Sequence, residues 1–248
     1  MCRKQEWYAL YYGETLDRKI KLSDRLSTIA GFIGEGASVA DVGTDHGQLP
    51  VYLAQNMPGG RIIASDISAG SLDSALNTAE KYGVSEKITF IVTPGLEGIG
   101  KSDADTIVIS GLGGETIAGI LKDATWTKNG AKLILQPQTK TAELCIWLRE
   151  CGYSLRDAKL VLDNGRHYVV MLVVGGNADS VLEPELELLA RLIFNRDPLF
   201  TGYLDSIIER TRREVEGMRN SAAPDLLEIA VRLAMYVSLK EQNDKWQA

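Results

Sequence analysis

The chain has 248 residues, of which 45% are hydrophobic and 24% are charged, a composition typical of a globular protein with a sizeable core. Its formal net charge of -6 excludes a polybasic, histone-like nucleic-acid binder, although a local basic patch is compatible with it. The sequence holds neither a run of about 18 apolar residues nor a secretory signal in its first ten residues, so we expect a cytoplasmic protein without a membrane span.

Cysteine and histidine give no pattern typical of a metal site. Cys2, Cys145 and Cys151 form no C-x-x-C pair, and neither His46 nor His167 has another histidine or a cysteine at metal-ligand spacing. We therefore expect no disulfide framework and no metal, and the sequence leaves the oligomeric state open.

Short β-branched and apolar runs alternate with longer helical patterns over the first two thirds of the chain. The predicted strands are Ser38–Val42, Arg61–Ser65, Ile88–Val92, Thr106–Ser110, Ala131–Gln136 and Tyr168–Val174. The predicted helices are Leu22–Gly34, Leu49–Gln55, Ser68–Tyr82, Thr116–Leu121 and Thr141–Cys151. Most of these strands are continuously apolar, which is typical of strands covered on both faces. The pattern predicts an α/β fold with a mostly parallel, doubly wound sheet.

The last third of the chain carries no strand pattern. After Pro184, apolar residues at helical spacing predict about three helices, with Gly202 and Pro224 as separators. We divide the chain into an α/β domain, residues 1–176, and a small C-terminal helical domain, residues 177–248. The apolar stripes of these helices fit packing against one another, and binding of a partner is the alternative.

The first chemical signal is the stretch Ala40–Gly47 at the end of the first predicted strand. Gly43 lets a ligand approach the backbone closely, and Asp41 and Asp45 place two carboxylates beside it. Such a loop is unfavourable for a pyrophosphate, which needs N–H groups and no anions. It suits S-adenosylmethionine (SAM), whose sulfonium and ammonium groups are cationic. His46 lies in the same loop, and the alternative is a plain turn with helix-capping aspartates.

Three more positions follow the ends of predicted strands. Asp66 can accept hydrogen bonds from ribose hydroxyls, or can cap the next helix. The glycines of Gly111–Gly114 free the backbone for close approach of a flat base, while Glu115 also suits a helix start. Gln136 carries both donors and an acceptor for a base edge.

Together these blocks resemble the bacterial tRNA adenine-22 N1-methyltransferase family. The resemblance rests on Lys21–Leu26, Ala40–Pro50, Gly111–Gly114 and Leu135–Gln138, with Gly165–Tyr168 similar to a later Gly-Lys-x-Tyr block. It implies a Rossmann-like SAM-methyltransferase domain with a seven-stranded, mostly parallel sheet and a coiled-coil-like helical tail. It also implies SAM as cofactor, tRNA as partner, and methyl transfer to N1 of an adenine in the D-loop region.

The resemblance, together with the position and charge of individual side chains, assigns roles to residues. We expect Asp45 and Gln136 to be catalytic. The expected cofactor-binding residues are Asp41, Gly43, Thr44, Asp45, His46, Asp66, Ile67, Gly95, Leu96 and Gly111. The expected substrate-binding residues are Arg25, Gly113, Gly114 and Arg166, and Arg149 and the Arg210–Arg213 group are further candidates for phosphate contacts.

One departure keeps alternatives open. The chain has Thr93-Pro94 where the family usually has Gly-Asp, so the carboxylate expected to hold the SAM adenine is replaced by a residue without a polar side chain. A catalytically weak protein that binds SAM or RNA is one alternative, and a small-molecule methyltransferase is another. A nicotinamide enzyme is disfavoured because the G-x-G-x-x-G pattern is absent.

Overall fold

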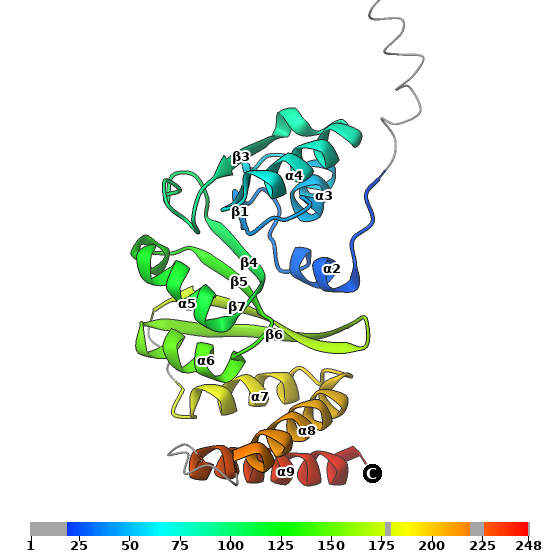
Figure 1. Ribbon diagram of the computed structural model, residues 1–248, viewed down its shortest axis with the longest axis vertical. Helices are drawn as coiled ribbons and strands as arrows, with labels where there is room; N and C mark the ends of the chain where they lie inside the picture. The colour runs from blue at the N-terminus through cyan, green and yellow to red at the C-terminus, as the bar shows by residue number, and fades with distance from the viewer. Residues whose placement is uncertain (1–18, 177–179, 219–225, 248) are drawn as a thin grey trace, which may run out of the picture.

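A computed structural model describes residues 19–176, 180–218 and 226–247. These residues build a seven-stranded sheet in the order β3-β2-β1-β4-β5-β7-β6, with helices on both sides (Figure 1). The strands are β1 (Val39–Val42), β2 (Ile62–Asp66), β3 (Ile88–Val92), β4 (Thr106–Leu112), β5 (Lys132–Pro137), β6 (Tyr153–Asp163) and β7 (Arg166–Gly175). The helices are α2 (Asp24–Ala30), α3 (Gln48–Asn56), α4 (Ala69–Lys81), α5 (Gly114–Asp123), α6 (Thr141–Glu150), α7 (Pro184–Phe194), α8 (Phe200–Met218) and α9 (Leu226–Gln247), with short 3-10 turns at Ser85–Lys87 and Thr125–Lys128.

The sheet confirms the mostly parallel, Rossmann-like prediction. Strands β1 to β5 pair in parallel, and β7 pairs antiparallel with both β5 and β6. The order reverses at β1, which has β2 on one side and β4 on the other. In open α/β sheets, ligands bind outside the carboxyl ends of the strands at this switch point.

Two apolar cores cover the two faces of the sheet. One contains Ile29, Leu49 and Leu72 from α2, α3 and α4, and the other contains Ile117 and Leu144 from α5 and α6. Because every residue of β1 is buried, this strand is apolar apart from Asp41. Within the described residues, no helix is both long and apolar enough to cross a membrane.

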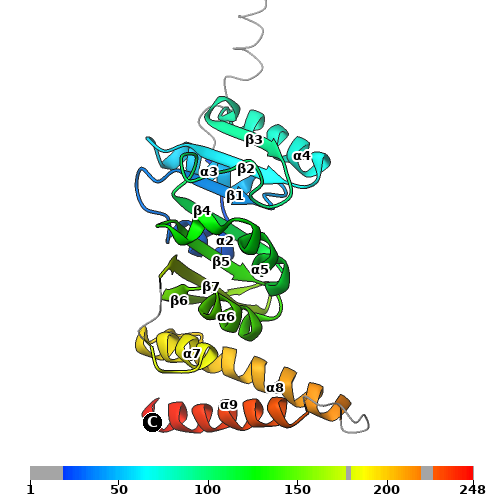
Figure 2. The ribbon, with the colours of Figure 1, turned by 90° about the vertical axis from the view of Figure 1, so that its left-hand side faces the viewer.

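The C-terminal helices continue the second core. Helix α7 packs against β6 and α6, and α8 and α9 run side by side below it (Figure 2). Leu189, Leu192, Phe200 and Leu204 of α7 and α8 are buried in the same cluster as the sheet residues. The division of the chain at residue 176 stays a prediction.

Two sequence predictions of local structure were wrong. Strand β6 was not predicted, because a register shift between Leu155 and Asp157 interrupts its alternation. Gly202 does not separate helices but lies inside α8, where a Cβ atom would be 3.0 Å from the His167 ring. Glycine at this position therefore lets the His167 ring pack closely against α8. Pro224 lies outside the described residues.

Candidate active site

Two adjoining clefts lie at the carboxyl ends of the central strands. We call the smaller one, of about 430 Å³, the polar cleft, and the larger one, of about 920 Å³, the apolar cleft. Both are lined by Gly43, Asp66 and Leu112, so they form one continuous site. The polar cleft is also lined by Arg25, Leu26, Asp41, Thr44, Asp45, His46, Gln48, Leu49, Ser110, Gly111 and Gln138.

The β1–α3 loop crosses the floor of this site. The N–H groups of Gly43 and Thr44 both donate to the Ser65 carbonyl, at 2.8 and 3.0 Å, which ties the loop to β2. Gly43 and Asp45 have positive φ values of 74° and 52°. The left-handed backbone at Asp45 is uncommon for a residue with a side chain, and it turns this carboxylate toward the cleft mouth. Gly47 also has a positive φ, of 67°, and in addition serves packing, since its Cβ would lie 2.7 Å from that of Ala75.

Asp41 is a buried carboxyl group beneath the loop. Its Oδ2 accepts a hydrogen bond of 2.8 Å from the Thr44 hydroxyl. Burial raises the pKa of Asp41 to about 6, the Thr44 hydrogen bond opposes this rise, and nearby Asp66 adds to it. A cation bound beside Asp41 would therefore stabilise the ionised form that the folded protein disfavours.

Asp66 ends β2 between the two clefts. Its Oδ1 accepts from the Ser68 N–H at 2.8 Å, and its Oδ2 lies 3.4 Å from the Asp45 nitrogen. The carboxylate is thus held in place by backbone donors, and Ser68 itself caps α4 through Ser71. Each carboxylate oxygen has more than one acceptor position, so Asp66 can still accept from a ligand hydroxyl.

Asp45 and His46 are exposed at the mouth of the polar cleft. Their side chains are 73% and 64% exposed and lie 3.7 Å apart at Asp45 Oδ2 and His46 Nε2. His46 Nδ1 is 2.8 Å from the Ser74 hydroxyl of α4, which fixes the imidazole ring. Asp45 therefore stays available to a ligand while its neighbour is anchored.

The ends of β4 and β5 form the opposite wall. The register of this pair shifts between Ser110 and Leu112, and Gly111 sits in the irregularity with φ of 79°. The Gln136 side chain is fully buried, and its Oε1 accepts from both the Gly111 N–H, at 3.1 Å, and Arg25 Nη1, at 2.8 Å. Gln136 therefore links the backbone of β4 to a guanidinium in the cleft.

Several predicted site residues do not line either cleft. Gln136 lies behind the wall, and Gly114 is buried, where a Cβ would be 2.4 Å from the Lys140 carbonyl. Gly113 caps α5, and Arg166 is exposed at the start of β7. Arg149 is paired with Glu187 of α7 and with the Leu182 carbonyl, an internal contact that conflicts with its predicted phosphate role.

Sequence reasoning missed Gln138, Ser110 and Leu112 in the polar cleft. Gln138 belongs to the Leu135–Gln138 block, but it follows the end of β5 at Pro137, where the chain leaves the sheet, so it is exposed whereas Gln136 inside the strand is buried. Strand alternation gives no signal for this difference, because residues two positions apart in a strand share a face.

The apolar cleft has a different construction. It is lined by the predicted cofactor-binding residues Ile67, Gly95 and Leu96. The remaining lining residues are Val42, Thr93, Pro94, Glu97, Gly98, Ile99, Thr116, Gly119, Ile120, Asp123, Ala124 and Trp126. Thr93 Oγ1 donates to the Glu97 carbonyl at 2.9 Å and closes the turn that follows β3. Pro94 is exposed at this turn. Among the described residues no cluster of three His, Cys, Asp or Glu side chains could hold a metal ion.

Comparison with known proteins agrees with this geometry. A family model described as a methyltransferase domain matches residues 22–171. The tRNA (adenine(22)-N(1))-methyltransferase of Bacillus subtilis is 37% identical over 166 residues, which are 66% of this chain and 70% of that protein. The chain belongs to the tRNA (adenine(22)-N1)-methyltransferase family.

Solved structures of this family are similar to this chain over most of its length. The B. subtilis m1A22 tRNA methyltransferase TrmK is 30% identical, with a TM-score of 0.75 over 90% of this chain and all of that one. M. capricolum TrmK, in complex with the cofactor product S-adenosyl-homocysteine, is 29% identical, with a TM-score of 0.74 over 89% of this chain and 98% of that one.

Proposed function

We propose that the chain transfers the methyl group of SAM to N1 of adenine 22 in tRNA. The observation that carries this proposal is a cleft at the switch point of a methyltransferase fold, with Asp41, Asp45 and Asp66 lining it. Three carboxylates favour a cationic nucleoside ligand over a phosphate. Family membership supports the identity of the acceptor.

The residues present fit SAM. Asp41 and Asp45 suit its cationic methionyl end, and Asp66 suits the ribose hydroxyls because it lies where the two clefts join. Ile67, whose side chain is 74% exposed, and Leu96 offer apolar surface for the adenine ring in the apolar cleft. Gly43 and Gly111 leave the backbone open to close approach.

Methyl transfer to N1 of adenine requires little proton chemistry. When bound, SAM supplies a methyl group whose bond to sulfur breaks as the N1 lone pair of an unpaired adenine attacks it. The protein's main task is to orient the two reactants and to stabilise charge. The methylated base is a cation, so the Asp45 carboxylate at the cleft mouth stabilises the charge that develops on it. We assign Gln136 a positioning role, through Arg25 and Gly111.

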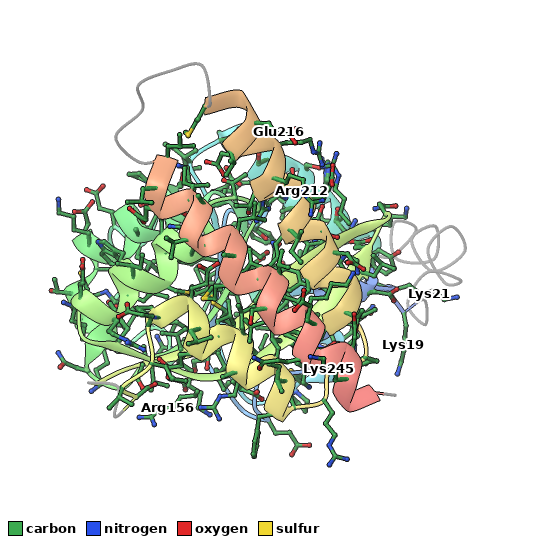
Figure 3. The ribbon with its side chains drawn as sticks, turned by 90° about the horizontal axis from the view of Figure 1, so that it is seen from below. Lys19, Lys21, Arg156, Arg212, Glu216 and Lys245 are labelled. Atoms are coloured by element: carbon green, nitrogen blue, oxygen red, sulfur yellow. The ribbon has the colours of Figure 1, made fainter. Side chains whose placement is uncertain are left out.

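The acceptor base must leave its stack to reach the polar cleft, at a cost of a few kcal/mol. Contacts with tRNA phosphates offset this cost, and basic residues near the cleft are the candidates. Lys19 and Lys21 project from one side of the molecule and Arg156 from the opposite side (Figure 3). We place the tRNA on the Lys19 side, with Arg166 as a further phosphate contact. The reason is that Arg25, which lines the polar cleft, lies in α2, and this helix follows Lys21 directly in the chain.

Radiolabelled methyl transfer tests the proposal. The purified chain is incubated with methyl-labelled SAM and with two tRNA transcripts that differ only in whether position 22 is adenine or guanine. We expect label in the adenine transcript alone. Label in both transcripts would contradict the choice of acceptor, and binding of SAM without any transfer would favour a catalytically weak binding protein in which Pro94 impairs the adenine site.

A further inference from the structure

The hairpin formed by β6 and β7 brings two side chains against Arg25, which lines the polar cleft. Its turn is Asn164-Gly165, with φ values of 49° and 74°, as a tight two-residue hairpin requires. Asp163 and Tyr168 flank this turn on the two strands. The hairpin is also held from below, because His167 Nδ1 lies 3.0 Å from the Ser206 hydroxyl of α8.

Both side chains contact Arg25 of α2. Its Nε lies 3.7 Å from Asp163 Oδ2, and its Cζ lies 6.0 Å from the centroid of the Tyr168 ring. The Arg25 and Asp163 side chains are only 24% and 18% exposed, so solvent screens this pair less than a surface pair. With Nη1 bonded to Gln136, the guanidinium is held on three sides.

This arrangement places Arg25 on the acceptor side of the site. Its partners Gln136, Asp163 and Tyr168 come from β5, β6 and β7, on the side of β4 away from β1 and β2, whereas Asp66 marks the nucleoside side at β2. Among the described residues, Arg25 is the one Lys or Arg side chain that lines the polar cleft. A guanidinium has five N–H donors in one plane, so donors remain for a nucleotide after those directed at Gln136 and Asp163.

We propose that Asp163 and Tyr168 are positioning residues for methyl transfer, which act by holding the Arg25 guanidinium against the acceptor nucleotide. This inference rests on the proposed function. Neither residue needs to touch the nucleotide. A long arginine side chain loses rotamer freedom when it binds, and a guanidinium already fixed by a ring face and a carboxylate loses less.

The Tyr168 substitutions separate this role from others. Tyr168→Leu removes the aromatic face, and we expect kcat/KM for tRNA to fall by about threefold to tenfold, mainly through KM. Tyr168→Phe keeps the face and loses only the hydroxyl, so it should retain the wild-type value. Leu162→Ala, at an exposed position of the same hairpin, is the matched control. Asp163→Asn should lower kcat/KM by about twofold to fivefold, because it removes the charge beside Arg25 and keeps the shape.

A double-mutant cycle tests whether the effect passes through Arg25. In an Arg25→Ala background the guanidinium is gone, so Tyr168→Leu and Asp163→Asn should cause no further loss. The equilibrium Kd for SAM and the thermal unfolding midpoint are measured on every variant, and both should match the wild type. The one exception is Tyr168→Leu, for which we expect a lower unfolding midpoint; Tyr168→Phe should not show this decrease.

Four results would overturn the inference. The first is an equal loss of kcat/KM in Tyr168→Phe and Tyr168→Leu, and the second is a further loss of kcat/KM when either substitution is added to Arg25→Ala. The third is a weaker affinity for SAM that accounts for the loss, and the fourth is wild-type kcat/KM in both Asp163→Asn and Tyr168→Leu. If the wild-type chain itself methylates no tRNA, the proposed function fails first and the inference falls with it.

Discussion

The polar and apolar clefts are neighbours, yet they are built by different means. In the polar cleft, charged and polar side chains are fixed by one another: Thr44 holds Asp41, and Gln136 holds Arg25. In the apolar cleft, backbone turns and apolar surfaces set the shape, as at Gly95, whose Cβ position lies 3.0 Å from Ile120. We infer that substitutions in the polar cleft change the rate and the pH dependence of cofactor binding, whereas those in the apolar cleft change cofactor affinity without changing its pH dependence.

The strongest test of this contrast is Asp45→Asn. Asparagine keeps the size of the side chain and removes the charge that faces the cationic product, so kcat should fall by about 100-fold while the chain stays folded. Single-turnover methylation at saturating SAM and tRNA measures the effect. Asp73→Asn, on the exposed surface of α4, is the control. An unchanged rate in Asp45→Asn would remove Asp45 from the mechanism.

A pH titration of SAM binding tests the polar cleft at Asp41. Burial raises the pKa of this carboxyl to about 6, and the cationic end of SAM prefers the ionised form. Affinity should therefore fall by about tenfold from about pH 7.5 to about pH 5, as Asp41 becomes protonated. Isothermal titration calorimetry across this range gives the profile, and a flat profile would contradict the contact.

The raised pKa of Asp41 also predicts how the stability of the folded chain depends on pH. Because the pKa of Asp41 is higher in the folded than in the unfolded chain, the folded state binds the proton more tightly, and this contribution to stability is lost as pH rises toward about 6. Asp41→Asn should then raise the free energy of unfolding at neutral pH by about 3 kcal/mol. The variant should also lose the pH dependence of SAM binding.

The smallest effect is expected in the apolar cleft. Pro94→Asp introduces the carboxylate that the family resemblance led us to expect at this turn, and one added hydrogen bond to the cofactor's adenine should tighten SAM binding by about threefold to tenfold. Pro94→Ala is the control, because it removes the proline ring without adding an acceptor. A larger change in kcat than in SAM affinity would break the distinction between the two clefts.

The order of strands and helices was largely predictable from the sequence. The continuous apolar runs of β1 and β4 fit strands covered on both faces, and Ser68 marked the start of α4 as its N-cap. Strand β6 lies at the sheet edge, where one face is partly exposed and a register shift breaks the alternation. Asn164-Gly165 was the signal that could have revealed it, since this pair favours a two-residue hairpin turn.

The site was predictable at the level of loops and less so at the level of side chains. Residues of the β1–α3 loop and Asp66 line the clefts because the carboxyl ends of parallel strands converge at one edge. The sequence could not tell that Gln136 points behind the wall while Gln138 faces the cleft. It also could not place Asp163 and Tyr168 beside Arg25, because contacts separated by more than 130 residues depend on the register of an edge hairpin.

The core shared by the sheet and α7–α8 has a consequence for how this molecule unfolds. Leu188, Leu192 and Leu204 are buried in the same cluster as Leu133 and Met171 of the sheet. Separating the helices from the sheet would expose both surfaces to water, at about 25 cal/mol for each Å² of apolar area. We therefore expect the C-terminal helices and the sheet to unfold in one cooperative transition, so that the rigidity of the hairpin that holds Arg25 depends on the helices beneath it.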